Sequence, residues 1–267
     1  MDSSYHTHPL GKRFPFVKSI EDLTIFEAWG SLANRPKYIT FYTISPKEEV
    51  FFGQSPKSKS EMDLADYLSG LEYIRDEEVF PKVPAAVSLT IAPDDLDGAS
   101  TFIKRPGLNC YEIMKGSGYI PKKFLDEALA IERISKAPHP NIVQYYGCRV
   151  RRGRITGIVL GSLGLTLRQY ASTPDYQQLD KTAFISGLVS AVDHLHSQGL
   201  AHNDVSPDNI MVKDGMPVLI DFGSCRPFGN NLQSLEMPRQ EEPLFTSEKN
   251  HDAHSIRIIQ EWLQSHK

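Results

Sequence analysis

The chain has 267 residues, enough for one large domain or two modest ones, and its 40% hydrophobic and 23% charged residues are the balance of a globular protein. Its net charge of −4 argues against a surface for nucleic acid or an anionic membrane, and no apolar run approaches the length of a membrane span. Cys110, Cys148 and Cys225 have unrelated spacings that form neither a metal-ligand pattern nor a disulfide framework, which indicates a reducing, intracellular compartment, expected to be the cytoplasm.

Residues 1–97 carry no motif with a chemical meaning, but they show local patterns. Apolar residues over 20–32 predict a short amphipathic helix, and the segments 37–44 and 50–52 predict a hairpin. Ser60 is a candidate N-cap for a helix that follows it. A cluster of prolines and aspartates marks a boundary at the end of this region. We therefore expect an N-terminal extension, whose hairpin and helix are candidates for joining the domain that follows.

From residue 99 onward, short strands alternate with longer helices. Strands are expected at 99–104, 142–148, 154–160, 210–212 and 217–220. Helices are expected at 121–136, 167–171, 182–197 and 252–264. Gly199 is expected to end the third of these helices in a left-handed conformation. The arginine-rich stretch 149–154 indicates a solvated turn between two strands.

Two short motifs carry the chemistry of this chain. The run from His202 to Asn209 holds Asp204 and Asn209 five residues apart, and Asp221 opens the sequence Asp-Phe-Gly a short loop later. This spacing suits phosphoryl transfer to a hydroxyl group. Asp204 would face the hydroxyl, while Asn209 and Asp221 would hold the divalent cation that bridges the nucleotide phosphates.

These motifs resemble the catalytic loop and the metal-binding loop of eukaryotic protein kinases. The segment His139-Pro140-Asn141-Ile142-Val143 and the order of strands and helices over about 99–264 are similar to a protein kinase domain as well. The resemblance implies an α+β, two-lobed protein kinase-like fold over residues 98–267, with a small β-rich lobe and a truncated, mainly helical lobe. It also implies ATP and Mg²⁺ as cofactors. The short pattern as a whole resembles divergent kinase-like proteins of fungi.

The resemblance assigns a phosphate-binding pair. Lys104 looks like the strand lysine that contacts the inner phosphates of the nucleotide, and Glu127 looks like the carboxylate that pairs with it, since an unpaired buried charge is costly. The simpler reading is that Lys104 is an exposed lysine beside Arg105, because most lysines are exposed. Lys115 is the alternative for the phosphate-binding role.

The resemblance also assigns an adenine-binding hinge. Leu160 looks like the gatekeeper residue, and Gly161 to Leu163 would offer backbone groups to adenine; the alternative is an ordinary buried strand end. His202 and Phe222 are expected to pack behind the site.

Asp252 and Cys225 each have two readings. Asp252 either anchors the backbone of the catalytic loop or serves only as a helix N-cap. Cys225, just after the Asp-Phe-Gly sequence, is either accessible to electrophiles or an unreactive packing residue.

Several features depart from the kinase pattern. No glycine-rich segment precedes Lys104, so a hairpin within residues 35–55 is a candidate substitute for the phosphate cover. Asn203 replaces the arginine that usually reads a phosphorylated activation loop, which argues against such a switch. Ser206 replaces the lysine that contacts the transferred phosphoryl group, which weakens transition-state stabilisation. No Ala-Pro-Glu sequence is present, and we expect a large lobe without the final helices of a protein kinase.

Three functions remain open at this point. The leading one is an ATP- and Mg²⁺-dependent phosphotransferase that acts on Ser or Thr hydroxyls of a protein. The second is a pseudokinase, a binding or scaffold module without useful turnover, and the third is a kinase for a small-molecule hydroxyl. We expect neither a nucleic-acid nor a membrane partner. The sequence leaves the substrate, the oligomeric state and the role of residues 1–97 open.

Overall fold

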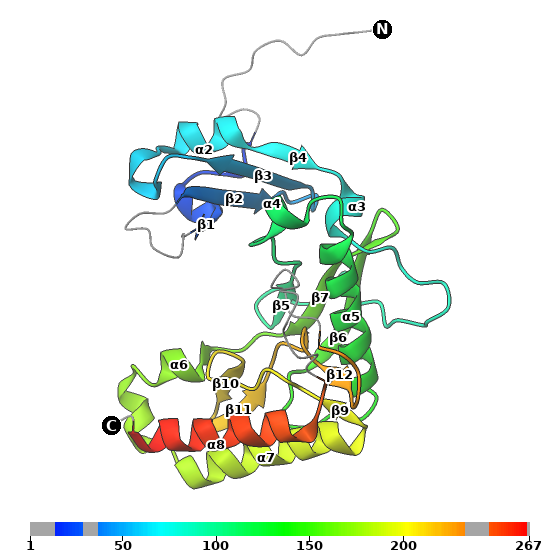
Figure 1. The fold of residues 1–267 in the computed structure, drawn as a ribbon, viewed down its shortest axis with the longest axis vertical. Helices are drawn as coiled ribbons and strands as arrows, with labels where there is room; N and C mark the ends of the chain where they lie inside the picture. Colours follow the sequence, from blue (N-terminus) through cyan, green and yellow to red (C-terminus); the bar gives the residue numbers. More distant parts are fainter. Residues whose placement is uncertain (1–13, 29–36, 233–245, 266–267) are drawn as a thin grey trace, which may run out of the picture. The chain divides into compact units, whose positions relative to one another are not determined.

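A computed structural model describes residues 14–28, 37–232 and 246–265, which form two compact units (Figure 1). Unit 1 contains the residues up to Val83 together with 106–122 and 151–156. Unit 2 contains 84–105, 123–150 and the residues from Gly157 onward. Each unit thus gathers segments that lie far apart in the sequence, and the domain boundary expected after residue 97 stays a prediction.

Unit 1 is built on an antiparallel sheet with the strand order β1-β2-β3-β4. The strands are β1 (Thr24–Ala28), β2 (Tyr38–Ile44), β3 (Val50–Ser55) and β4 (Glu72–Ile74). The expected hairpin is confirmed, because β2 and β3 pair from Ile44 and Val50 to Ile39 and Ser55. Helix α2 (Leu64–Gly70) covers one face of this sheet, where the rings of Tyr67 and Phe41 meet edge to face at 4.9 Å.

Two expectations for unit 1 were wrong. The segment 20–32 is not a helix within the described residues: a single 3-10 turn, η1 (Ile20–Asp22), precedes β1, and residues 29–32 lie outside the described part. Pairing with β2 along all five residues of β1 outweighs the local helical pattern. Ser60 is not the N-cap of α2. It lies inside η2 (Lys59–Glu61), and Asp63 caps α2 by accepting a hydrogen bond from the Asp66 N–H at 2.8 Å.

The arginine-rich turn belongs to unit 1 and is not simply solvated. Arg152 and Gly153 have positive φ and reverse the chain between β6 (Tyr145–Arg151) and β7 (Arg154–Gly161), so the turn itself is confirmed. The Arg152 guanidinium, however, pairs with Asp76 at 2.6 Å and donates to the Lys47 and Glu48 carbonyls. The short helices α3 (Asp76–Val79) and α4 (Tyr111–Met114) complete this unit.

Unit 2 contains a three-stranded sheet with the order β5-β7-β6, where β5 is Thr101–Lys104. Helix α5 (Tyr119–Ile134) enters this unit at Lys123 and is tied to β6 by the Tyr145 hydroxyl, which donates to the buried Glu132 at 3.0 Å. Ile91 bridges Cys148 on β6, so the segment before β5 lies at the sheet edge opposite to β5. Among the described residues, β5 pairs only with β7.

The rest of unit 2 is mainly helical. It contains α6 (Leu167–Tyr170), η3 (Pro174–Gln178), α7 (Lys181–Ser197) and α8 (Lys249–Ser265). Small sheets join β8 (Leu165–Thr166) to β10 (Ile210–Lys213) and β11 (Met216–Leu219), and β9 (Leu200–Ala201) to β12 (Arg226–Pro227). These elements confirm the expected order, and Gly199 ends α7 with a φ of 72° as predicted.

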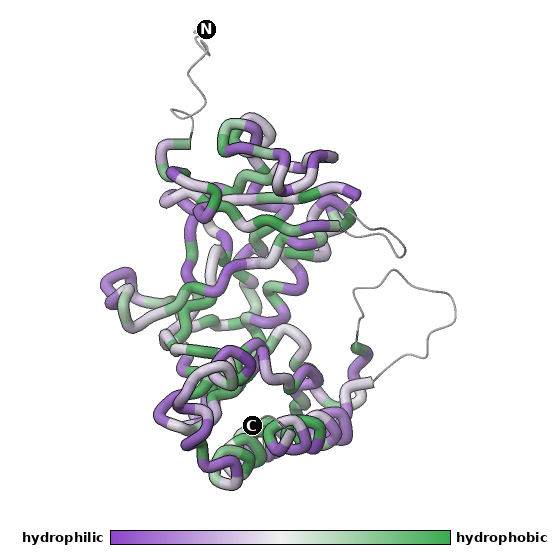
Figure 2. Tube along the Cα trace, turned by 90° about the vertical axis from the view of Figure 1, so that its left-hand side faces the viewer, coloured by the Kyte–Doolittle hydropathy of each residue, from purple (hydrophilic) through white to green (hydrophobic). Residues whose placement is uncertain are grey.

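Helices α7 and α8 are amphipathic and pack together. Figure 2 shows both apolar and polar residues in the helical part beside the C-terminus, as helices with one buried face require. Phe184, Leu188 and Leu195 of α7 and Ile259 and Leu263 of α8 are buried. Across the ranges that the structure describes, no helix has the length and apolar character needed to cross a membrane.

Candidate active site

A buried carboxylate holds the backbone of the catalytic loop in place. Asp252 is fully buried in the first turn of α8. It accepts hydrogen bonds from the backbone N–H groups of His202 at 2.8 Å and Asn203 at 2.7 Å, and it pairs with His196 at 2.9 Å. Because these contacts satisfy a buried charge, the loop-anchoring reading of Asp252 is confirmed and the simple N-cap reading is wrong.

Asn203 connects the loop to the residues around it. Its φ is 64°, a left-handed conformation that asparagine tolerates better than most residues. Its side-chain amide donates to the carbonyls of Ala201 at 3.0 Å and Ser224 at 3.1 Å and to the Ser247 hydroxyl at 3.0 Å. An uncharged amide therefore holds three segments together where a kinase usually has an arginine. Ser247 carried no signal in the sequence, because its partners are 21 and 44 residues away.

Asp204, Asn209 and Asp221, the three residues expected to carry catalysis, lie close together. The Asn209 side chain donates to the Asp204 carboxylate at 2.9 Å, and the Asn209 carbonyl accepts from the Ile220 N–H at 3.0 Å, directly before Asp221. Burial raises the pKa of Asp204, and the nearby Asp221 charge raises it further, while His202 and Asn209 oppose the rise. Two neighbouring carboxylates repel each other when both are ionised, and a bound cation would reduce this repulsion.

These donors fit Mg²⁺. Asn209 offers an amide oxygen and Asp221 a carboxylate, and hard oxygen ligands of this kind are the ones that Mg²⁺ prefers. Asp221 has a φ of 61° and accepts a hydrogen bond from the Gly223 N–H at 3.1 Å, which fixes the direction of its carboxylate. Its metal role and that of Asn209 stay predictions.

Lys104 is paired with two carboxylates at once. Its ammonium lies 2.5 Å from Glu127 of α5 and 2.9 Å from Asp221, and only 23% of its side chain is exposed. Burial disfavours the charged lysine, but the two carboxylates outweigh this and raise the pKa of Lys104. The reading of Lys104 as an ordinary exposed lysine is therefore wrong. The alternative, Lys115, is exposed at the end of α4.

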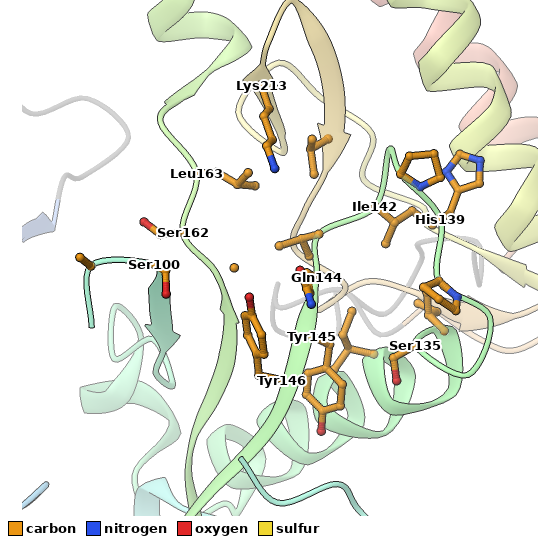
Figure 3. A pocket seen from close by; sticks show the side chains of 18 residues that line it. Ser100, Ser135, His139, Ile142, Gln144, Tyr145, Tyr146, Ser162, Leu163 and Lys213 are labelled. Atoms are coloured by element: carbon orange, nitrogen blue, oxygen red, sulfur yellow. The ribbon is translucent and has the colours of Figure 1, made fainter. Parts of the chain in front are cut away.

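The expected hinge follows the end of β7. Leu160 is buried and pairs with Phe102 across the sheet, while Gly161 pairs with Thr101. Gly161 and Leu163 line a hollow of about 950 Å³, together with Gln144 directly before β6, Tyr146 of β6 and other residues (Figure 3). Lys104, Glu127 and Asp221 do not line this hollow. The adenine-binding roles of Leu160, Gly161 and Leu163 stay predictions.

Two aromatic rings support the site as expected. His202 and Phe222 are buried, and their rings meet at 5.3 Å. His202 accepts the Asp204 N–H at Nδ1 and contacts the Ile220 carbonyl through Nε2, which is the pattern of a neutral imidazole. Cys225 is only 2% exposed, and burial raises the pKa of its thiol to about 12. An electrophile-accessible Cys225 was therefore a wrong expectation.

The candidate phosphate cover is paired inside unit 1. Within the described residues, the β2–β3 hairpin has β1 and β4 as its strand neighbours, whereas β5 belongs to the sheet of unit 2. A role for this hairpin over the phosphates stays a hypothesis.

Comparison with known proteins gives a family match. The family model described as protein kinase domain matches residues 111–246, just over half of the 267 residues. The chain is similar to sperm motility kinase 2B of Mus musculus, with 37% identity over 95 residues that cover 35% of this chain and 20% of that protein. It is also similar to the MAP kinase kinase kinase win1 of Schizosaccharomyces pombe, with 29% identity over 130 residues that cover 46% of this chain and 9% of that protein.

A third relative is the serine/threonine-protein kinase PINK1, mitochondrial, of Rattus norvegicus. It is 32% identical over 133 residues, which cover 38% of this chain and 23% of that protein. The chain thus spans less than a quarter of the length of each of these three relatives.

Proposed function

Because this chain belongs to the protein kinase family, we propose that it transfers the terminal phosphoryl group of ATP to a serine or threonine hydroxyl of a protein substrate. The family match also confirms the α+β protein kinase fold expected from the sequence. One observation carries the proposal: Lys104 pairs with Glu127 and with Asp221 at the same time, at 2.5 and 2.9 Å. Phosphoryl transfer needs the strand lysine, the helix carboxylate and the metal-loop carboxylate in one cluster.

Each residue then has a defined task. Asp204 accepts the proton of the substrate hydroxyl. As it does so, the hydroxyl oxygen bonds to the γ-phosphorus, and the bond between that phosphorus and the oxygen bridging to the β-phosphate breaks, which releases ADP. Lys104, held by Glu127, positions the inner phosphates. Asn209 and Asp221 would hold Mg²⁺, which supplies positive charge to the phosphate oxygens when bound.

A second candidate is a binding module with little or no turnover. Ser206 supports it, because the catalytic loop lacks the cation that usually contacts the transferred group, and so does the missing glycine-rich segment. This candidate uses the same nucleotide site, so binding alone does not distinguish the two. Phosphorylation of a small hydroxyl compound is a variant of the first candidate with another acceptor.

Thermal unfolding of the purified chain with ATP, with Mg²⁺ and with both provides the first test. A ligand that binds only the folded state raises the unfolding midpoint, so we expect a rise that needs both components and that Asp221→Asn removes. Asp208→Asn, which changes an exposed carboxylate of the catalytic loop, serves as the control. Transfer of labelled phosphate to a generic protein substrate then separates the enzyme from the binding module. No midpoint rise at millimolar ATP and Mg²⁺ would refute the proposal.

A further inference from the structure

The catalytic loop leaves one charge requirement unmet. In the transition state, the transferred phosphoryl group carries negative charge on its non-bridging oxygens, and a cation close to these oxygens stabilises it. Ser206 offers no cation from the loop. Lys104 does not fill the gap, because its ammonium is engaged by both Glu127 and Asp221.

Lys123 lies beside the same cluster. It precedes Glu127 by four residues, so the two side chains share one face of α5. A Cβ atom placed on Gly223 of the metal-binding loop would lie 3.9 Å from the Cε atom of Lys123 and 3.7 Å from Oε2 of Glu127. The same point lies 3.1 Å from Oδ1 of Asp221. The end of the Lys123 side chain and the two carboxylates therefore converge on Gly223.

The charge of Lys123 reaches the residue proposed to accept the proton. Burial raises the pKa of Asp204 and of Glu127, and the positive charge of Lys123 opposes the rise at both. Its ammonium thus lies within electrostatic range of both carboxylates.

Lys123 is also uncommitted. It is half-buried, and among the described residues it makes no hydrogen bond or ion pair. Nearby cations are already engaged: Arg226 pairs with Asp126 at 3.4 Å, and Arg168 pairs with Asp208 at 2.7 Å. A half-buried ammonium that is near two carboxylates of the site but in direct ion-pair contact with neither is suited to an anionic group that arrives with the nucleotide.

We propose that Lys123 is a catalytic residue that contacts the transferred phosphoryl group, in place of the loop lysine that Ser206 replaces. This inference rests on the proposed function. Lys123 forms no covalent bond and moves no proton; it stabilises negative charge that is larger in the transition state than in bound ATP. The Lys104–Glu127 ion pair fixes the part of α5 that carries it, so the cation comes from the helix instead of the loop.

The kinetic test removes the positive charge at position 123 and then restores a positive charge at position 206 of the catalytic loop. Lys123→Met keeps the aliphatic stem and should lower kcat by about 10²-fold while KM for ATP changes by less than about threefold, because a transition-state contact is lost. Lys123→Arg should retain most of the activity. Ser206→Lys, added to Lys123→Met, should recover about tenfold of the loss, since the cation returns at the loop position. The exposed neighbour Lys122→Met is the control and should stay near the unmodified chain.

A Lys123→Met variant with unchanged kcat would overturn the inference. So would a loss of kcat in Lys123→Met that Ser206→Lys does not restore and that Lys123→Arg shares, provided that the thermal midpoint is unchanged. The rescue by Ser206→Lys is the decisive result, because a merely structural role for Lys123 would not respond to a charge on another element.

A binding experiment separates this inference from the proposed function. Calorimetry with Mg²⁺ compares ADP with a non-hydrolysable ATP analogue, and Lys123→Met should weaken binding of the analogue by about twofold to threefold and leave binding of ADP unchanged. If the unmodified chain binds neither nucleotide, the proposed function fails and the inference falls with it. If both bind and Lys123→Met treats them alike, only the role of Lys123 is refuted.

Discussion

Unit 1 and the catalytic centre of unit 2 both bury charged groups, but they satisfy them differently. In unit 1, Glu48 is 2% exposed and its carboxylate accepts the Thr156 hydroxyl, while Arg152 bonds the Glu48 carbonyl and pairs with Asp76. Each of these four residues has a partner from the unit itself. In the catalytic centre, the charge of Asp221 raises the pKa of Asp204, and Lys123 makes no ion pair in the described part of the chain.

The difference separates a structural network from a binding site. A saturated network stabilises the fold, because every buried donor and acceptor is paired. A cluster that keeps like charges together and leaves a cation free is less stable than it need be, and a ligand of the right charge relieves that cost. Substitutions in the two regions should therefore differ in kind, with catalysis affected in one and stability in the other.

The largest effect is expected at Asp204. Asp204→Asn keeps the shape of the side chain and removes the base, so kcat should fall by about 10³-fold while nucleotide affinity stays within about threefold. Phosphate transfer and calorimetry measure the two quantities. Asp208→Asn, four residues along the same loop and 57% exposed, should change kcat by less than about twofold. Equal losses in the two variants would mean that Asp204 has no special role.

Asp252 should show that the catalytic centre also needs a saturated support. Asp252→Ala leaves two buried backbone N–H groups and His196 without their acceptor, so the free energy of unfolding should fall by about 3 kcal/mol. Urea unfolding measures it. The exposed Asp193→Ala in α7 is the control, with an expected change within about 0.5 kcal/mol. A small loss for Asp252→Ala would contradict its anchoring role.

Arg152 tests whether unit 1 is structural alone. Arg152→Ala removes the pair with Asp76 and two bonds to carbonyls, and it should destabilise unit 1 by about 1 to 2 kcal/mol, a modest value because the side chain is partly exposed. Hydrogen exchange of the β2 and β3 amides should accelerate, while peptides from 200–223 should not change. The exposed pair Lys57–Asp66 supplies the control, since Lys57→Ala should have almost no effect. Faster exchange in the catalytic loop would contradict this separation.

The smallest effect expected is a pH dependence from His202. Burial lowers the pKa of His202, although Asp252 and the Ile220 carbonyl oppose the shift. The unfolded chain binds this proton with a pKa of about 6.5, so below that pH it holds more protons than the folded chain, and stability falls as the pH drops. The slope from one such group is at most about 1.4 kcal/mol per pH unit.

Urea midpoints at pH 7.5 and pH 5.5 test this slope. His202→Gln should flatten the dependence, and the exposed His254→Gln should not. Burial also lowers the pKa of His139, so part of the slope should remain in the His202 variant. A slope that His202→Gln leaves unchanged would show that another group causes it.

The sequence determined the order of elements after residue 99 and the two loops that carry chemistry. These follow from local rules: apolar spacing predicts helices and strands, Gly199 predicts a helix end, and short motifs keep Asp204, Asn209 and Asp221 within one stretch of chain. The helix expected at 20–32 failed because strand pairing with β2 outweighs a local pattern.

Only the tertiary structure decided which charged side chains form ion pairs and which do not. Whether Lys104 is buried and paired depends on Glu127, 23 residues away, and on Asp221, far beyond it. The roles of Asp252 and Asn203 depend on contacts with residues tens of positions away in the sequence. In the same way, Arg152 is not simply solvated because it pairs with the distant Asp76. Lys123 looks like any surface lysine in the sequence. Its proposed role arises because the fold brings α5 to Gly223, and long-range electrostatics depends on distance in space, which local patterns do not encode.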